Sequence, residues 1–163
     1  FFIPKFTYIK NRILSFFNPN DGTHNFQSDK AIDAISSGGY FGKGIGEGTL
    51  KNRVPEAHTD YIISVISEEF GVVAIVLLLT LFLFFIYRVF KIIYLEKNEK
   101  IKLVLTGTIC LIIFQALIHI GVNIRLFPTT GMTLPFLSYG GSSIVGVSIL
   151  SGIILNLTKR NID

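Results

Sequence analysis

The feature that most constrains the fold is the apolar run of residues 72–87, whose one polar residue is Thr80. A bilayer core about 30 Å thick needs a helix of roughly 20 mostly apolar residues. With its flanks, this run predicts a membrane-spanning helix over residues 61–90, and two further runs predict spans over 101–124 and 141–157. Half of the chain is apolar and only 16% is charged. The sequence therefore predicts an all-α polytopic membrane protein with three transmembrane helices.

The distribution of basic residues predicts the orientation. The connection between the first two spans is rich in lysine, and the tail carries Lys159 and Arg160, whereas residues 125–140 carry only Arg125. Loops with many Lys and Arg residues stay in the cytoplasm. We therefore expect residues 1–60 and 125–140 on the outer side.

The chain divides into two parts at about residue 60. Residues 1–60 read as an extracytoplasmic loop with short interfacial helices, an amphipathic one over 8–17 and a second over 27–35. Residues 61–163 contain the three spans, the cytoplasmic Lys-rich loop and the outer segment 125–140. The net charge of +4 suits a surface that meets anionic lipid or a phosphorylated substrate.

A glycine-rich run covers residues 37–48, with Lys43 in its middle. A phosphate-binding loop needs Gly-Lys followed by Ser or Thr, but Lys43 is followed by Gly44, and no strand is expected before the run. Two roles stay open. The glycines allow tight turns with positive φ, or their backbone amides and Lys43 contact an anionic ligand.

The main candidate site lies in residues 53–61, where Arg53, Glu56, His58 and Asp60 precede the first span. Ionisable groups at a membrane span suggest a functional site because their desolvation is costly. The alternative is that Thr59 or Asp60 simply caps the helix. A carboxylate near a helix N-terminus stays ionised and can act as a general base. Transfer onto a sugar hydroxyl and proton-coupled transport both remain possible at this point.

Two further polar features flank this site. Gln115, His119 and Asn123 form one stripe on the second span, which serves either as hydrogen-bonding glue between helices or as the lining of a wet cavity. Residues 125–140 contain prolines and glycines, so they predict a non-helical re-entrant loop that is buried or lines a cavity. Its hydroxyls, with those just beyond it, would cap freed backbone groups or contact a ligand: Ser138, Tyr139, Ser142 and Ser143.

Four motifs occur in a fixed order along the chain. They are Arg-Ile-Leu-Ser-Phe-Phe-Asn-Pro at 12–19, Ser-Gly-Gly-Tyr-Phe-Gly-Lys-Gly at 37–44, Pro-Glu-Ala-His-Thr-Asp at 55–60 followed by Glu-Glu-Phe-Gly at 68–71, and Gly-Met-Thr-Leu-Pro-Phe-Leu-Ser-Tyr-Gly-Gly-Ser-Ser at 131–143. With them the chain resembles the SEDS family of cell-wall polymerases, which includes FtsW, RodA and SpoVE. Arg53-Val54 and the Gly-Met-Thr-Leu-Pro segment look more like the FtsW branch than the RodA branch.

The resemblance implies a ten-span SEDS fold, of which this chain would be the C-terminal part. It implies a peptidoglycan glycosyltransferase that polymerises lipid II into β-1,4 glycan strands during cell division, by an inverting mechanism. The protein would lie in the bacterial inner membrane at the division septum, with its active site on the extracytoplasmic side. Its partners would be lipid II, membrane lipid, a class B penicillin-binding protein and other divisome proteins. We expect no nucleic-acid partner.

The resemblance also places the catalytic residue, and the residue patterns above supply the other candidates. Asp60 would be the catalytic base. The substrate-binding candidates are Lys43, Glu56, His58, Asn123, Ser138, Tyr139, Ser142 and Ser143. We expect no covalently bound cofactor; a divalent cation (Mg²⁺ or Mn²⁺) or basic side chains such as Lys43 would neutralise the leaving pyrophosphate. The alternatives are a lipid II flippase using Asp60, His119 and the re-entrant loop, a RodA-type elongation polymerase, or an anchor that only recruits division proteins.

Overall fold

The computed structural model describes residues 24–54 and 57–159. These residues form helices without any strand: α2 (His24–Gly38), α3 (Leu50–Arg53), α4 (Ile62–Leu95), α5 (Glu99–Asn123) and α6 (Gly141–Lys159). The last three are long and apolar enough to cross a membrane. The predicted all-α fold with three membrane-spanning helices is therefore confirmed, and the chain is a multi-pass membrane protein.

The helix bounds differ from the predicted ones mainly at the C-terminal end of α4. This helix continues to Leu95, beyond the predicted end at residue 90, while α5 and α6 begin and end close to their predicted limits. The short helix predicted over residues 27–35 lies inside α2. The amphipathic segment predicted over residues 8–17 lies outside the described residues.

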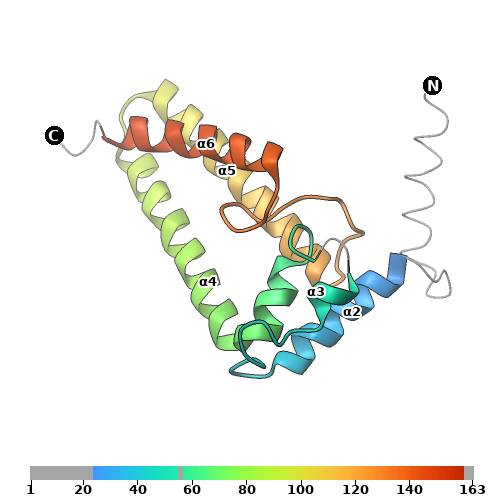
Figure 1. Cartoon of the computed structure of the whole chain (residues 1–163). Coiled ribbons are helices and arrows are strands. Elements are labelled where there is room, and N and C mark those ends of the chain that lie inside the picture. Colours follow the sequence, from blue (N-terminus) through green and yellow to red (C-terminus); the bar gives the residue numbers. More distant parts are fainter. Residues whose placement is uncertain (1–23, 55–56, 160–163) are drawn as a thin grey trace, which may run out of the picture.

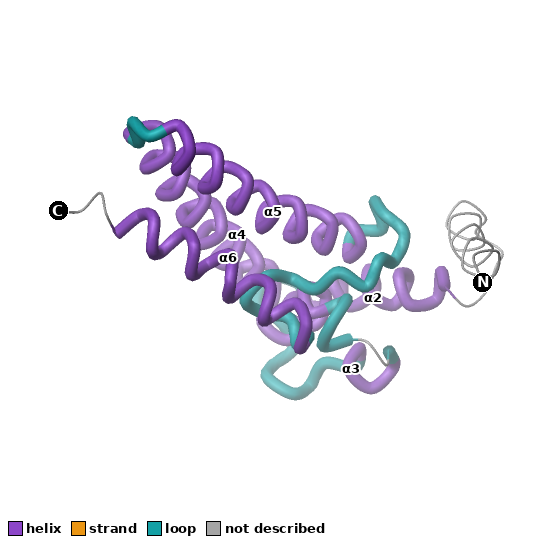
Figure 2. Tube along the Cα trace, turned by 90° about the horizontal axis from the view of Figure 1, so that it is seen from above, coloured by secondary structure: helices purple, strands orange, loops and turns teal. Residues whose placement is uncertain are grey.

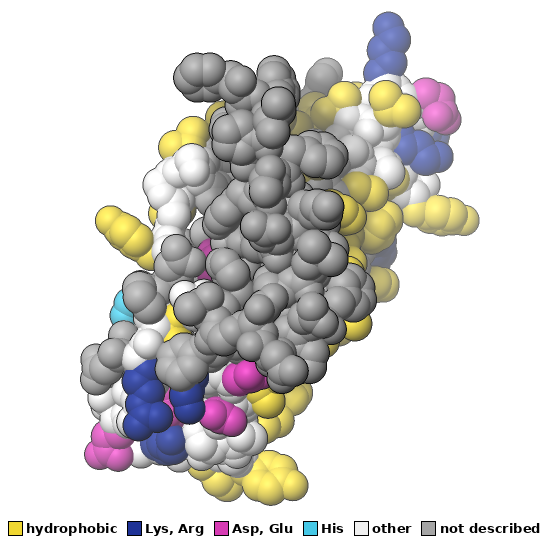
Figure 3. Space-filling view, turned by 90° about the vertical axis from the view of Figure 1, so that its right-hand side faces the viewer, with side chains coloured by type: hydrophobic (Ala, Val, Ile, Leu, Met, Phe, Trp, Pro, Cys, Tyr) yellow, Lys and Arg dark blue, Asp and Glu magenta, His cyan; other side chains and the backbone are white. Residues whose placement is uncertain are grey.

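The loops gather at opposite ends of the long helices (Figures 1 and 2). The connection between α4 and α5 lies at one end, whereas α2, α3 and residues 125–140 lie together at the other. Figure 3 shows charged side chains at both ends of one face, with hydrophobic side chains between them. This arrangement fits a membrane-spanning body whose two ends face water. Which end lies on which side of the membrane stays a prediction.

The half of the bundle near the Lys-rich connection is held by apolar packing. Val89 and Ile93 of α4 pack with Leu105, Ile109 and Ile112 of α5, and Ile154 of α6 joins them. Apolar side chains on the outside of these helices are largely exposed within the chain, as lipid-facing or partner-facing positions would be.

Helix α4 is broken at Gly71, where φ is 78° and ψ is −176°, and Figure 1 shows the resulting bend. In an unbroken helix the amides of Val72 and Val73 would donate to the carbonyl oxygens of Glu68 and Glu69. Here a loop inserts instead, and all four groups find new partners. Val72 N donates to Gly39 O (3.0 Å) and Val73 N to Tyr40 O (3.3 Å). Glu68 O accepts from Lys43 N (2.9 Å) and Glu69 O from Gly44 N (3.1 Å).

Glycine is required where the loop and the helix meet. A Cβ atom on Gly42 would lie 2.1 Å from Glu69 O, and one on Gly71 would lie 2.3 Å from Tyr40 O. Both residues also have positive φ, which side chains rarely tolerate. The turn interpretation of the glycine-rich run therefore holds for residues 38–44. Its contact with an anionic ligand stays a prediction.

The N-terminus of α4 differs from the capping interpretation. The helix begins at Ile62, its N-cap residue is Tyr61, and the Tyr61 side chain makes no capping hydrogen bond. Neither Thr59 nor Asp60 occupies the cap position, so that interpretation is wrong. Asp60 instead precedes the cap by one residue, in a segment that other contacts hold in place.

Candidate functional site

The backbone of residues 58–60 is held by three successive hydrogen bonds. The carbonyl oxygen of His58 accepts from the amide of Tyr139 (3.2 Å). That of Thr59 accepts from Ser138 Oγ (2.9 Å). That of Asp60 accepts from Asn123 Nδ2 (2.9 Å). Irregular backbone at a membrane boundary must have its polar groups satisfied, and these three donors do so. We call residues 58–60 with these donors the backbone clamp.

The flanks of the clamp are fixed by apolar packing. Ala57 and Tyr61 are fully buried in a cluster formed with α2, α3 and α5, whose other members are Ala31, Ala34, Leu50, Val54, Val65 and Val122. Asp60 is only 7% exposed, whereas His58 is exposed. Asp60 thus lies in a segment that is anchored on both sides.

Asn123 connects the clamp to α4. Its Oδ1 accepts from the amide (3.2 Å) and the hydroxyl (2.8 Å) of Ser64, and its Nδ2 also donates to His119 O (2.9 Å). An amide side chain has two donors and two acceptor positions, so all four are used within the protein. Asn123 is fully buried, and in this arrangement it supports the backbone of Asp60.

The rest of the polar stripe holds the segment between α5 and α6. Gln115 Nε2 donates to Thr133 O and to Ser143 Oγ, both at 2.9 Å. The Nδ1 atom of His119 lies 2.9 Å from Met132 O. These contacts match the glue interpretation of the stripe, because each side chain binds a backbone or hydroxyl group of a neighbouring element.

The other predicted hydroxyls lie on this segment and in the first turn of α6. Ser138 is buried and also accepts from the amide of Leu134 (2.8 Å), while Tyr139 is 78% exposed. Both line a pocket of about 360 Å³ between this segment and α6. Ser142 and Ser143 line a second pocket of about 320 Å³, which Gln115 also borders. These pockets are open spaces beside the clamp in which a ligand could be held.

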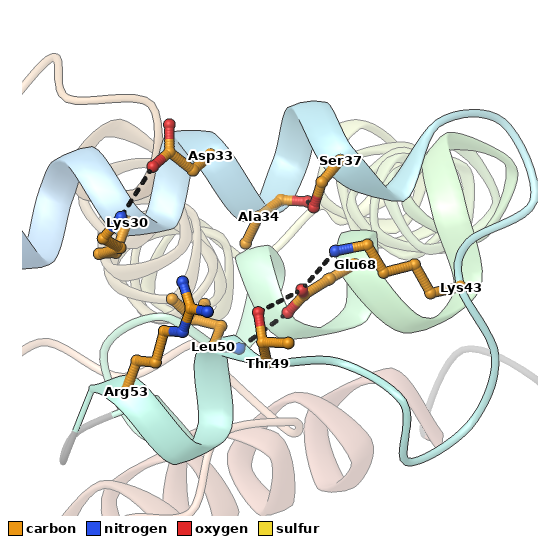
Figure 4. Close-up of a pocket in the computed structure, with 9 residues that line it drawn as sticks. All are labelled: Lys30, Asp33, Ala34, Ser37, Lys43, Thr49, Leu50, Arg53 and Glu68. Atoms are coloured by element: carbon orange, nitrogen blue, oxygen red, sulfur yellow. Dashed lines mark hydrogen bonds and ion pairs between the residues drawn. The ribbon is translucent and has the colours of Figure 1, made fainter.

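Lys43 lies in a different cluster. Its Nζ is 2.9 Å from Oε1 of Glu68, and together they border a pocket of about 280 Å³ that Lys30 and Arg53 also line (Figure 4). The structure thus brings Ser138, Tyr139 and Asn123 to the segment that carries Asp60, whereas it places Lys43 against Glu68. Glu56 lies outside the described residues.

The structure also reveals residues that sequence reasoning missed. Glu68 belongs to the Glu-Glu-Phe-Gly motif but had no role of its own in the sequence prediction, yet it is 1% exposed and its carboxylate accepts three hydrogen bonds. Ser64 and Gly71 likewise had no assigned role. An isolated glycine inside an otherwise helical pattern was the available signal at Gly71. Nothing in the sequence indicated which loop would fill the break.

No group of three or more His, Cys, Asp or Glu side chains gathers to hold a metal ion within residues 24–54 and 57–159.

Comparisons with known proteins agree with these features. Residues 1–162 match the family model of the cell cycle proteins FtsW, RodA and SpoVE. A Caulobacter vibrioides protein named probable peptidoglycan glycosyltransferase FtsW is 41% identical over 157 residues, which is 95% of this chain and 40% of that relative. Relatives with the same name from Geobacter metallireducens and Enterococcus hirae are 36% and 38% identical, with 98% and 96% of this chain covered. The chain covers 44% and 40% of these two relatives, so it spans less than half the length of all three.

A solved structure gives the same result for the fold. It comes from work titled "Structural coordination of polymerization and crosslinking by a peptidoglycan synthase complex", and it matches with a TM-score of 0.75 and 27% identity. The match covers 94% of this chain and 42% of that chain. The sequence motifs, the helical fold and these matches together show that the chain belongs to the FtsW/RodA/SpoVE family of cell cycle proteins.

Proposed function

We propose that this chain forms the C-terminal part of a peptidoglycan glycosyltransferase that polymerises lipid II into β-1,4 glycan strands, with Asp60 as the general base. The observation that carries the proposal is the match, over nearly the whole chain, to relatives named probable peptidoglycan glycosyltransferase FtsW. The backbone clamp supports the choice of Asp60, because it fixes this residue next to the N-terminal end of α4. The shared FtsW name also favours the divisional role over the RodA-type alternative.

The proposed reaction is a single displacement. The 4-hydroxyl of the acceptor GlcNAc attacks the anomeric carbon of the donor MurNAc, and Asp60 takes the hydroxyl proton. The new bond joins that oxygen to the anomeric carbon, while the bond to the phosphate oxygen breaks and undecaprenyl pyrophosphate leaves. An inverting transfer of this kind needs one base. A fixed carboxylate is suited to it, because proton transfer requires hydrogen-bond reach to the attacking oxygen.

The charge on the leaving pyrophosphate must be neutralised. Pyrophosphate oxygens are good ligands for Mg²⁺ or Mn²⁺. Within residues 24–54 and 57–159, no three His, Cys, Asp or Glu side chains come together to hold such an ion. Lys43 remains the proposed basic contact within this chain, and its pairing with Glu68 leaves its side chain 36% exposed. Tyr139 and Ser142, which border the two pockets beside the clamp, are the proposed sugar contacts.

The setting of this reaction is also part of the proposal. We place the active site on the extracytoplasmic side of the inner membrane at the division septum, with a class B penicillin-binding protein and other divisome proteins as partners. The solved relative belongs to a peptidoglycan synthase complex that polymerises and crosslinks, which supports a crosslinking partner. The concentration of basic residues at the α4–α5 end supports the orientation.

The test is a polymerisation assay with purified lipid II, using the full-length protein and its penicillin-binding partner. Asp60→Asn should lower the rate by about 100-fold or more, since general-base catalysis contributes 10²–10⁴-fold. Glu99→Gln is the control, because Glu99 is exposed at the start of α5, at the opposite end of the molecule, and this variant should polymerise at the wild-type rate. Substantial polymerisation by Asp60→Asn would refute the base assignment. Lipid movement across a vesicle bilayer without product growth would favour the transporter instead.

A further inference from the structure

The carboxylate of Glu68 joins two parts of the outer loop to α4. Its Oε1 accepts from Lys43 Nζ (2.9 Å) and from Thr49 Oγ1 (3.1 Å), and its Oε2 accepts from the amide of Leu50 (3.0 Å). The carbonyl oxygen of the same residue accepts from the amide of Lys43 (2.9 Å). Figure 4 shows the side chain of Glu68 reaching from α4 to the start of α3. One residue thus holds the loop at two places.

The location of Glu68 makes this arrangement costly to disturb. The residue is 1% exposed and stands three residues before the break at Gly71. A buried carboxylate is tolerated only with enough donors, and here an ammonium, a hydroxyl and a backbone amide supply them. Glu68 also gives the Leu50 amide a partner at the start of α3, where the first amides of a helix have no acceptor within the helix.

The path from Glu68 to the clamp is short and packed. Leu50 and Val54, at 2% and 1% exposure, belong to the same apolar cluster as Ala57 and Tyr61. These four residues bracket the chain that leads from the Glu68 contact to Asp60. A shift of Leu50 therefore moves a packed unit that carries the clamp, because close-packed interiors transmit strain.

We infer that Glu68 is a positioning residue for Asp60, acting through Leu50 and α3. The inference rests on the proposed function, since it takes glycan polymerisation as the reaction that the Asp60 carboxylate serves. Glu68 itself does not touch substrate in this role. Its carboxylate fixes the start of α3, and α3 with the apolar cluster fixes one end of the clamp.

The test replaces Glu68 by Gln in the full-length protein with its penicillin-binding partner. Either orientation of the amide sets an NH₂ donor against at least one of the three donors, so the contact cannot be completed. Misplacement of a catalytic group by about 1 Å can cost roughly 100-fold. We expect kcat for lipid II polymerisation to fall about tenfold, with KM within about twofold of wild type. Glu47→Gln, an exposed carboxylate in the same loop, is the matched control and should leave kcat unchanged.

Amide hydrogen exchange separates positioning from a general loss of structure. Glu68→Gln should raise exchange in residues 49–61 and leave the apolar parts of α4 and α5 unchanged. Wild-type kcat in the variant, unchanged exchange in residues 49–61, or raised exchange throughout these helices would each overturn the inference. If wild-type protein itself does not polymerise lipid II, the proposed function fails instead.

A milder variant decides the question where Glu68→Gln does not fold. Thr49→Val removes one of the three hydrogen bonds, and Thr49 is exposed, so the packed unit stays intact. We expect it to raise exchange in residues 49–61 and to lower kcat about threefold with KM unchanged. A Thr49→Val protein with wild-type kcat and exchange would contradict the role given to the Glu68 contact.

Discussion

The two ends of this molecule are held together by different forces. At the end near the α4–α5 connection, isoleucines, leucines and valines of three helices pack without polar contacts between them. At the clamp end, hydrogen bonds from α5 and residues 131–143 hold irregular backbone, and the polar stripe supplies many of the donors. Apolar packing adapts to small changes of shape, whereas a buried hydrogen bond is lost when one partner is removed. The contrast indicates that the first end is scaffold and that the second end specifies a geometry.

The break in α4 lies between the apolar end and the clamp end. Beyond Gly71 the helix is apolar and regular, and before it the helix carries Ser64 and Glu68, which bind the clamp end. The inserted loop satisfies the four groups that the break frees, so the bend is a built feature of the fold.

Of the substitutions considered, Gly71→Ala should have the largest effect on stability. The added Cβ would meet Tyr40 O at 2.3 Å in a backbone conformation with positive φ, so the inserted loop must withdraw. Losing four backbone hydrogen bonds and adding strain should lower the free energy of unfolding by about 4 kcal/mol. The check is thermal unfolding of the full-length protein in detergent. Gly107→Ala in α5 is the control, because a Cβ there meets nothing within 4 Å, and equal melting temperatures for the two variants would contradict the account.

Ser138→Ala should have an intermediate effect that is concentrated on activity. It removes the hydrogen bond to Thr59 O and the acceptor for the Leu134 amide, a loss of about 1–2 kcal/mol. Since the lost bond holds the clamp, lipid II polymerisation should fall about tenfold. Ser151→Ala is the control, because the Ser151 hydroxyl donates to Val147 O within α6 and Ser151 is not among the residues that line either pocket beside the clamp, so this variant should polymerise normally. Similar rates for both variants would show that the Ser138 bond does not set the geometry.

Ile112→Val, in the apolar end, should have the smallest effect. Ile112 is fully buried between helices, and loss of one methylene from such a position costs about 1 kcal/mol. The melting temperature should fall slightly, and the polymerisation rate should stay within about twofold of wild type. A large loss of activity with retained stability would contradict the view that the apolar end serves only as a scaffold.

Sequence reasoning predicted the apolar end well because its signal is local. The length and composition of each run fix a spanning helix wherever its neighbours lie, so the predicted spans match α4, α5 and α6 closely. The helical spacing of Gln115, His119 and Asn123 also predicted one polar face correctly, because side chains four residues apart share a helix face.

The clamp end could be predicted only in part. The motif at residues 55–60 pointed to Asp60, but the donors that hold this segment come from Asn123, Ser138 and Tyr139, far away along the chain. The cap at Tyr61 was missed because a buried aromatic residue that makes no capping hydrogen bond leaves no capping signal in the sequence. The break at Gly71 and the buried contact of Glu68 depend on which loop reaches the helix. The spacing of apolar residues along the sequence does not predict such a contact.

The central claim is that the clamp holds the Asp60 carboxylate at one point from which it takes a proton. The most direct measurement is the lipid II polymerisation rate of Asp60→Glu, which keeps the charge and the base but moves the carboxylate outward by one methylene. A fixed geometry predicts a loss of about tenfold to 100-fold in kcat with normal folding, because misplacement of about 1 Å is that costly. A rate for Asp60→Glu close to that of the wild type would contradict the claim that the clamp sets the position of the base.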